Sequence, residues 1–157
     1  MPEQRRADLR KIFAPAIGSE LRGYSTAELL HDDGTWAAWP DLPIRLEWGS
    51  GSLIAISWSK FDDLWIAADE ALPFPVEGST VRWVRNGFDN LNGLVGARIL
   101  SVWLGRDEMS IGEKEFEIWT RLLIETDRGW LEVFNALDEN GYDCHRDRPS
   151  GTFLSCI

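Results

Sequence analysis

Two segments of the chain share the pattern of a β-hairpin, and this repeat limits the fold more than any other feature. In Trp119–Ala136, two runs of strand-forming residues flank a loop that ends in Gly129, which can take the positive φ of a tight turn. Ile44–Ser57 has the same layout around Gly49-Ser50-Gly51. A shift of 78 positions places Ile44 on Leu122, Leu46 on Ile124, Glu47 on Glu125, Gly51 on Gly129 and Leu53 on Leu131. The sequence therefore predicts a β domain built on two similar hairpins.

The rest of the chain divides into further strands and connecting segments. Predicted strands are Thr80–Val84, Val95–Leu104 with a bend or bulge at Gly96, Thr152–Ile157, and Leu64–Ala68, which could also be a short helix. Ser25-Thr-Ala-Glu28 has the spacing of a capping box and predicts a short helix through Leu30. The remaining segments are predicted as loops or irregular chain: His31–Gly34, Pro73–Pro75, Gly105–Glu115 and Tyr142–Gly151.

The N-terminal segment predicts a short amphipathic helix. Ala7, Leu9, Ile12 and Phe13 recur at roughly helical spacing among basic residues, and Pro15 stops the run. We expect one domain over residues 1–157, with this helix over 1–15, a β core over 42–137 and an irregular tail with a last strand over 138–157. The fold class is mainly β, or α+β, as an antiparallel curved sheet or a partly open barrel.

The chain is acidic, and this limits the partners that it can bind. The net charge is −10; the first 11 residues carry +2 and the other 146 carry −12. Such a field disfavours general nucleic-acid binding and attracts basic proteins. No apolar run reaches the length of a membrane span or of a signal peptide, so we expect a cytoplasmic protein that does not bind membranes.

No motif indicates catalysis, a cofactor or a metal site. His31-Asp32-Asp33 and Cys144-His145 lack the spacing of metal ligands, and Cys–His catalysis would need a third, orienting group. With only Cys144 and Cys156 present, no disulfide framework is indicated. A hydrolase using acidic residues, such as Asp63 and Asp138 on two sides of a bond, is the third hypothesis for function.

Nine tryptophans are the compositional outlier, and acidic doublets are the other recurring feature. Most of the tryptophans should fill the core, while two or three could line a groove that binds a sugar or another small molecule, which is the second hypothesis. The first hypothesis is a non-enzymatic interaction module, an inhibitor or immunity-type protein that binds a basic partner. The residues expected to bind it are Asp62, Asp63, Asp107, Glu108, Asp138 and Glu139, with Trp36 and Trp39 as anchors.

This character is similar to that of bacterial immunity proteins, which neutralise basic nuclease-type toxins. The similarity is one of composition and size, and no motif carries it.

Overall fold

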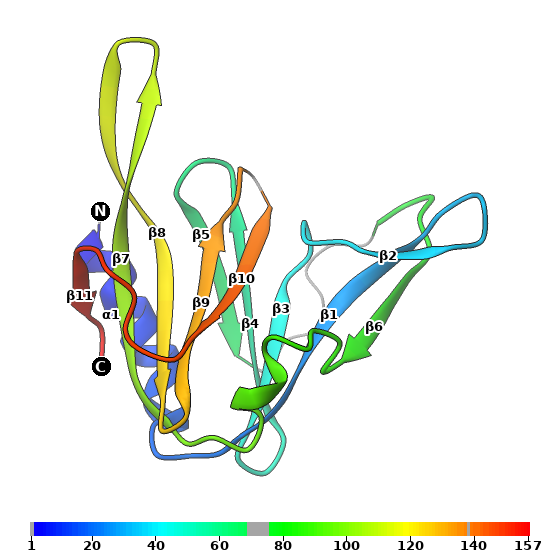
Figure 1. Ribbon diagram of the computed structural model, residues 1–157, viewed down its shortest axis with the longest axis horizontal. Coiled ribbons are helices and arrows are strands. Elements are labelled where there is room, and N and C mark those ends of the chain that lie inside the picture. The colour runs from blue at the N-terminus through cyan, green and yellow to red at the C-terminus, as the bar shows by residue number, and fades with distance from the viewer. Residues whose placement is uncertain (1, 69–75, 138) are drawn as a thin grey trace.

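The computed structural model describes residues 2–68, 76–137 and 139–157, and it consists mainly of antiparallel strands in two sheets (Figure 1). The elements in chain order are α1 (Pro2–Phe13), η1 (Ala14–Ala16), β1 (Leu21–Leu30), β2 (Trp36–Ala38), β3 (Ile44–Trp48), β4 (Ser52–Ser59), β5 (Asp63–Ala68), β6 (Val81–Arg85), η2 (Asn92–Leu94), β7 (Ile99–Ile111), β8 (Lys114–Thr126), β9 (Gly129–Asn135), β10 (Asn140–His145) and β11 (Phe153–Ser155). The sheets do not close into a barrel. The predicted fold class, an open antiparallel β fold with a short N-terminal helix, is confirmed.

The first sheet has the order β2-β1-β3-β4-β5, with β6 also paired to β1. Ser25 pairs with Arg45 of β3 and with Arg85 of β6, so these two strands lie on opposite edges of β1. Further along β1, Glu28 pairs with Ala38 of β2, which follows β3 on the same edge. The end of β1 together with β2 and β6 therefore projects from the body, and we call this part the wing (Figure 1).

The second sheet has the order β10-β9-β8-β7-β11, and its central hairpin is longer than its neighbours. β9 pairs with β8 only over Arg121–Thr126, and β11 pairs with β7 only over Trp103–Gly105. Residues 106–119 thus extend beyond the sheet as a two-stranded hairpin that projects from the body, here called the arm (Figure 1).

The core lies where the two sheets and the helix meet. Leu9 and Phe13 of α1 are fully buried and belong to one apolar cluster with residues of both sheets, such as Ile56 of β4 and Val133 of β9. Trp58 of β4 is 1 % exposed, and its indole Nε1 donates to the Val133 carbonyl oxygen at 2.9 Å. Because that N–H finds a backbone acceptor, the largest side chain of the core is buried without an unmet hydrogen bond.

Asn140 ties the first residue of β10 to the other sheet. Its side chain is buried, and its Nδ2 lies 2.9 Å from the Pro40 oxygen, 3.1 Å from the Leu42 oxygen and 3.2 Å from Ser57 Oγ. Its Oδ1 accepts from the Trp58 N–H at 2.6 Å. One side chain thereby satisfies backbone groups of a loop and of β4 that water cannot reach.

Arginines of α1 fix the helix to the last residues of the chain. Arg6 donates from Nη2 to the Ser155 oxygen at 2.7 Å, and Arg10 donates from Nε to the Cys156 oxygen at 2.7 Å. Arg5 donates to the Trp119 oxygen at 3.0 Å. The predicted helix is therefore docked on the body, and three of its four cations serve internal contacts.

The hairpin repeat is present, but its second half is shifted by one residue. Leu46 pairs with Ile54 in the first hairpin, and Ile124 pairs with Leu131 in the second. Leu131 therefore corresponds to Ile54, and its predicted match to Leu53 is wrong. The reason is the turn: three residues, Gly49–Gly51, separate β3 from β4, whereas two residues separate β8 from β9.

Two secondary-structure predictions are wrong because strand pairing outweighs local signals. Residues 25–30 form part of β1, with partners on both edges, and Glu28 bonds to Arg82 Nη2 of β6 at 2.7 Å instead of capping a helix. Gly105–Glu115 is not a loop: it forms the end of β7, a two-residue turn that Gly112 permits with φ +64°, and the start of β8. Its residues 106–115 belong to the arm.

Two further predictions differ from the structure in extent, and the strand alternative for Leu64–Ala68 is confirmed. The tail expected over 138–157 is not irregular throughout: β10 pairs with β9 as far as His145, and β11 is the predicted last strand. The strand expected from Val95 begins only at Ile99, after Gly96 with φ +90°. Leu64–Ala68 is a strand and not a helix. Pro73–Pro75 lies outside the described residues.

Candidate functional site

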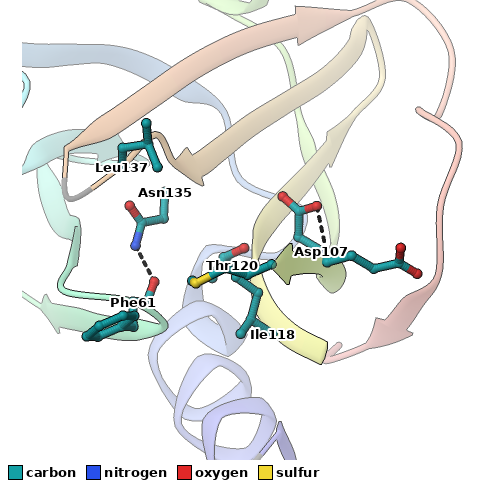
Figure 2. Close-up of a pocket in the computed structure, with 8 residues that line it drawn as sticks. Phe61, Asp107, Ile118, Thr120, Asn135 and Leu137 are labelled. Atoms are coloured by element: carbon teal, nitrogen blue, oxygen red, sulfur yellow. Dashed lines mark hydrogen bonds between the residues drawn. The ribbon is translucent and has the colours of Figure 1, made fainter. Parts of the chain in front are cut away.

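Two turns and the base of the arm, which are far apart in the sequence, meet at one end of the molecule and form a pocket of about 250 Å³. The turn between β4 and β5 supplies Phe61, the turn between β9 and β10 supplies Leu137, and the rest comes mainly from the base of the arm (Figure 2). The lining residues are Phe61, Asp107, Glu108, Met109, Ile118, Thr120, Asn135 and Leu137.

Phe61 and Leu137 have an unusual combination of exposure and backbone conformation. Phe61 is 62 % exposed and Leu137 is 97 % exposed, with φ angles of +59° and +58°. The left-handed region costs a residue with a Cβ on the order of 1 kcal/mol, and bulky residues are rare in it. Two apolar side chains are thus held toward solvent at the edge of one pocket, at a cost to the fold.

Hydrogen bonds hold both turns in these conformations. The Asn135 side-chain amide donates to the Phe61 carbonyl oxygen, which joins the two turns directly (Figure 2). The Asp63 N–H donates to the Lys60 oxygen at 3.2 Å, and the Ala136 N–H donates to the Glu139 oxygen at 2.8 Å. The surrounding structure therefore determines the strained backbone.

The arm carries an apolar face that continues from the pocket. Met109 pairs with Phe116, and Asp107 pairs with Ile118, so these side chains lie on one side of the hairpin. Ile111 lies on the same side and is 55 % exposed, while Phe116 is 46 % exposed. We call Met109, Ile111, Phe116 and Ile118 the apolar face. The opposite side of the hairpin carries the residues Arg106, Glu108, Ser110, Glu115, Glu117 and Trp119.

Negative charge surrounds this apolar surface. The arm contains five carboxylates and two basic side chains, a net charge of −3. Arg106 Nη1 lies 3.4 Å from Glu117 Oε2, and its Nη2 lies 3.9 Å from Glu108 Oε1. One guanidinium cannot neutralise the carboxylates at Asp107, Glu108, Glu115 and Glu117. The pocket and the apolar face therefore combine exposed hydrophobic groups with an acidic rim.

The structure brings some of the predicted site residues to this pocket and leaves others away from it. Asp107 and Glu108 line it, and Asp62 and Asp63 follow Phe61 directly. Asp62 Oδ2 lies 3.9 Å from Arg5 Nη1, so it also faces α1. Glu139 is exposed in the turn that carries Leu137. Asp138 lies outside the described residues.

The two predicted tryptophan anchors lie in or beside the wing and have partners within the chain. Arg82 stacks over the Trp36 ring, with its guanidinium carbon 4.2 Å from the ring centroid. Trp39 Nε1 donates to Asp41 Oδ2 at 3.1 Å. Neither residue lines the pocket.

Sequence reasoning missed Phe61 and Leu137, although a signal was present. Each is an apolar residue directly before an acidic doublet, Asp62-Asp63 or Asp138-Glu139, at matching points after the two hairpins. Only the acids were interpreted. Met109 was missed because Gly105–Glu115 was expected to be a loop.

The other reactive groups have structural surroundings. Burial raises the pKa of the Cys156 thiol to about 11, and burial also raises the pKa of the Cys144 thiol. Protonated thiols are poor nucleophiles near neutral pH. Both cysteines are free. Within residues 2–68, 76–137 and 139–157, no group of three or more His, Cys, Asp and Glu side chains could hold a metal ion.

A buried ionic cluster on the second sheet links three strands. Glu132 is 5 % exposed and lies 2.7 Å from Arg121 Nε and 2.8 Å from His145 Nε2. Arg121 also donates to the Ser150 oxygen at 3.1 Å and stacks on Phe153 at 4.8 Å from the ring centroid. With these partners, the cluster fixes the segment after β10 to the sheet.

Comparisons with known proteins give no family for this chain. No protein-family model, no curated protein and no solved structure matches it. In the described part of the chain, no helix has both the length and the apolar character needed to span a membrane.

Proposed function

We propose that this protein is a non-enzymatic interaction module that binds a basic protein through the pocket and the apolar face of the arm. The observation that carries the proposal is the pair Phe61 and Leu137, two exposed apolar residues in left-handed backbone at one pocket. Strain of this kind is retained where it serves function, and exposed apolar surface rimmed by polar groups is typical of binding sites. An inhibitor or immunity-type role fits a partner of opposite charge.

Charge supports a basic partner. The net charge is −10, and the pocket is lined by Asp107 and Glu108 with Asp62 beside it. Such a field speeds the encounter with a positively charged surface and repels acidic ones. Both cysteines are free, which fits a reducing compartment, and we include a cytoplasmic location in the proposal.

The structure favours this function over a tryptophan-lined site for a small molecule. None of the eight lining residues of the pocket is a tryptophan. At about 250 Å³, the pocket is also smaller than the roughly 300–1,000 Å³ usual for small-molecule sites. It has the size to accept one or two side chains of a protein.

The test is capture of a partner with matched variants. The tagged protein is incubated with a lysate of its source cells at low and at high salt, and a stoichiometric basic protein is expected at low salt. The purified partner is then titrated against the double variant Phe61→Gly, Leu137→Gly, which keeps the turns but removes both side chains. We expect affinity to fall at least about 30-fold, since two central apolar anchors are lost.

Controls separate the pocket from general surface effects. Leu100→Ala removes another exposed apolar side chain, which is 42 % exposed on β7 and does not line the pocket. Asp32→Asn with Asp89→Asn removes two exposed carboxylates elsewhere, for comparison with Asp107→Asn with Glu108→Gln. If the glycine variant binds as tightly as the wild type, or if no basic protein is captured, the proposal is wrong.

A further inference from the structure

The outer edge of β8 within the arm is an unpaired strand edge. β7 occupies one edge of β8 along its length, whereas β9 pairs with β8 only from Arg121 onward. In the described chain, no strand pairs with Lys114–Trp119 on the β9 side. This edge begins where the pairing of β8 with β9 ends, at Phe134, and the pocket residues Asn135 and Leu137 come directly after that point.

The register shows which backbone groups point outward along this edge. The two-residue turn Gly112-Glu113 makes Ile111 and Lys114 a hydrogen-bonded pair, so hydrogen-bonded and non-hydrogen-bonded pairs alternate from there. Ser110–Glu115, Glu108–Glu117 and Arg106–Trp119 are then the non-hydrogen-bonded pairs, whose N–H and C=O groups point away from the partner strand. The Arg106 N–H donates outward to the Thr152 oxygen at 2.9 Å, which agrees with this phase.

On β8, the backbone N–H and C=O groups that point outward are those of Glu115, Glu117 and Trp119. The Trp119 oxygen accepts from Arg5 at 3.0 Å, so it is already satisfied. For Glu115 and Glu117, the described residues provide no backbone partner at this edge. An incoming strand could therefore pair with Glu115 and Glu117 and would lie next to the pocket.

We infer that the partner inserts an extended segment that pairs with the free edge of β8 and alternates apolar with basic residues. This inference rests on the proposed function and specifies the partner's binding segment. Side chains of a strand alternate between faces, so one set would meet the apolar face and Leu137. The other set would meet Glu115 and Glu117 on the opposite side of the hairpin, where lysine or arginine gives charge complementarity.

A second copy of this chain fits the edge poorly. Pairing two arms through their β8 edges would place Glu115 and Glu117 near the same carboxylates of the other copy. Like charges across a strand pair are destabilising, and charged edges in general prevent pairing between copies. A basic segment is attracted by the same carboxylates.

Two synthetic peptides of equal composition test the pattern. The first, acetyl-Lys-Val-Lys-Val-Lys-Val-Lys-amide, alternates basic and apolar residues, and the second, acetyl-Lys-Lys-Lys-Lys-Val-Val-Val-amide, has the same charge without alternation. We expect the alternating peptide to bind at low salt at least about 10-fold more tightly and to slow amide hydrogen exchange at Glu115 and Glu117. Equal binding of both peptides, or no saturable binding of the alternating one, would overturn strand addition.

Two proline substitutions, one on each edge of the arm, test which edge the peptide pairs with. Glu115 and Ser110 face each other across the arm, and both N–H groups point outward, Glu115 on the β8 edge and Ser110 on the β7 edge. Proline at such edge positions removes one donor without breaking a bond within the arm. Glu115→Pro should weaken the alternating peptide at least about 10-fold, whereas Ser110→Pro should stay within about threefold. The charge control Glu115→Gln removes one carboxylate but keeps the N–H, so it should weaken the peptide clearly less than Glu115→Pro does.

The outcomes separate this inference from the proposed function. If Ser110→Pro weakens binding as much as Glu115→Pro, or if neither does, the β8 edge is not the docking edge. If the double variant Phe61→Gly, Leu137→Gly nevertheless fails to bind the captured partner, the proposed function of the pocket is retained and only strand addition is wrong. Circular dichroism and urea unfolding of each variant test whether the body remains folded. We expect that it does, because the arm tip contributes no residue to the buried core.

Discussion

At the scale of single residues, strained backbone coincides with the candidate site. Three non-glycine residues in the described chain have positive φ: Phe61, Asn86 and Leu137. Asparagine tolerates this region, and Asn86 also accepts the Tyr24 N–H at 3.0 Å through Oδ1. The other two are bulky, exposed and at the same pocket. A fold selected only for stability would place glycine there.

Leu137→Gly should therefore stabilise the protein. Leu137 is 97 % exposed, so its removal loses almost no buried area, while glycine relieves the left-handed strain. We expect a gain of about 0.5–1 kcal/mol in the free energy of unfolding, measured by urea denaturation. Leu137→Ala is the control, because alanine removes the side chain but keeps the Cβ, and it should give no gain. A destabilised glycine variant would contradict the strain argument.

Asn140→Ala should be strongly destabilising. The substitution leaves the Trp58 N–H and the Leu42 carbonyl oxygen short of a partner in a buried position, while the Pro40 oxygen keeps its bond from the backbone N–H of residue 140. Unsatisfied buried groups cost roughly 1–3 kcal/mol each, so we expect a loss of about 3 kcal/mol in urea unfolding. Asn90→Ala, at an exposed position, should change stability by less than about 0.5 kcal/mol. Similar values for the two variants would show that Asn140 does not join the sheets.

Cys156 should make stability fall at alkaline pH. The folded thiol has its pKa raised by burial to about 11 from a usual value of 9.0. Between these pH values the unfolded chain releases the proton while the folded protein retains it, so rising pH favours unfolding. A shift of this size corresponds to about 2–3 kcal/mol, lost between pH 9 and 11. Compared with the wild type, Cys156→Ala should show a shallower fall over that range. Parallel curves would contradict the prediction.

At the scale of elements, the arm is separable from the body. None of residues 107–118 belongs to the buried core, and the arm's strands pair only with each other. The body should therefore fold without the arm's outer part, as expected if the arm serves the proposed binding and not stability.

Replacing residues 108–117 by Asn-Gly tests this separation. The replacement joins Asp107 to Ile118, a hydrogen-bonded pair that a two-residue turn can close. We expect the free energy of unfolding to change by less than about 1 kcal/mol, while capture of the basic partner is lost. Loss of the folded body on shortening would show that the arm contributes to the core.

Elements whose signals are local could be predicted, and those that depend on distant partners could not. The hairpins β3–β4 and β8–β9 carry both alternation and turn glycines, and the sequence predicts them correctly. Ser25–Glu28 has a helix signal that fails because β3 and β6 pair with both edges of β1. The strands of the arm were not predicted, because their charged residues at alternate positions resemble the composition of a polar loop.

The candidate site was predictable only where its residues carry a local signal. Asp107 and Glu108 were expected to bind a partner, and the structure places them at the pocket. Their meeting with Phe61 and Leu137 depends on how the two sheets face each other, which no local pattern encodes. Trp36 and Trp39 were expected to anchor a partner, but pairs such as Arg82 with Trp36 are visible only once strands are aligned.

At the scale of the whole molecule, charge is distributed so that the acidic surface dominates. The basic residues Arg5, Arg6 and Arg10 of the N-terminal helix are engaged with carbonyl oxygens of the body. The N-terminal helix is therefore docked on the body and does not extend toward partners. The net charge of −10 sets the sign of the field that approaching proteins meet.

The association rate with the captured partner should depend strongly on salt. Between about 0.05 and 0.5 M salt the Debye length becomes shorter than the dimensions of the acidic surface. We expect the association rate constant to fall at least 10-fold in stopped-flow or surface measurements, while the dissociation rate constant changes much less. The Asp107→Asn, Glu108→Gln variant should show a smaller salt dependence. A rate independent of salt would contradict charge steering.

The contacts between α1 and the last strand set an order of events during protein synthesis. Arg6 and Arg10 bond to the carbonyl oxygens of Ser155 and Cys156, which are made roughly 145 residues later. At about 5–20 residues per second, the helix segment leaves the ribosome some 7–30 s before its binding site is complete. A single helix of 12 residues is barely stable alone, and the core around Leu9 and Phe13 stays incomplete until Cys156, which belongs to it, has been made. Residues 155 and 156 thus complete the packing of a helix that is synthesised well before them.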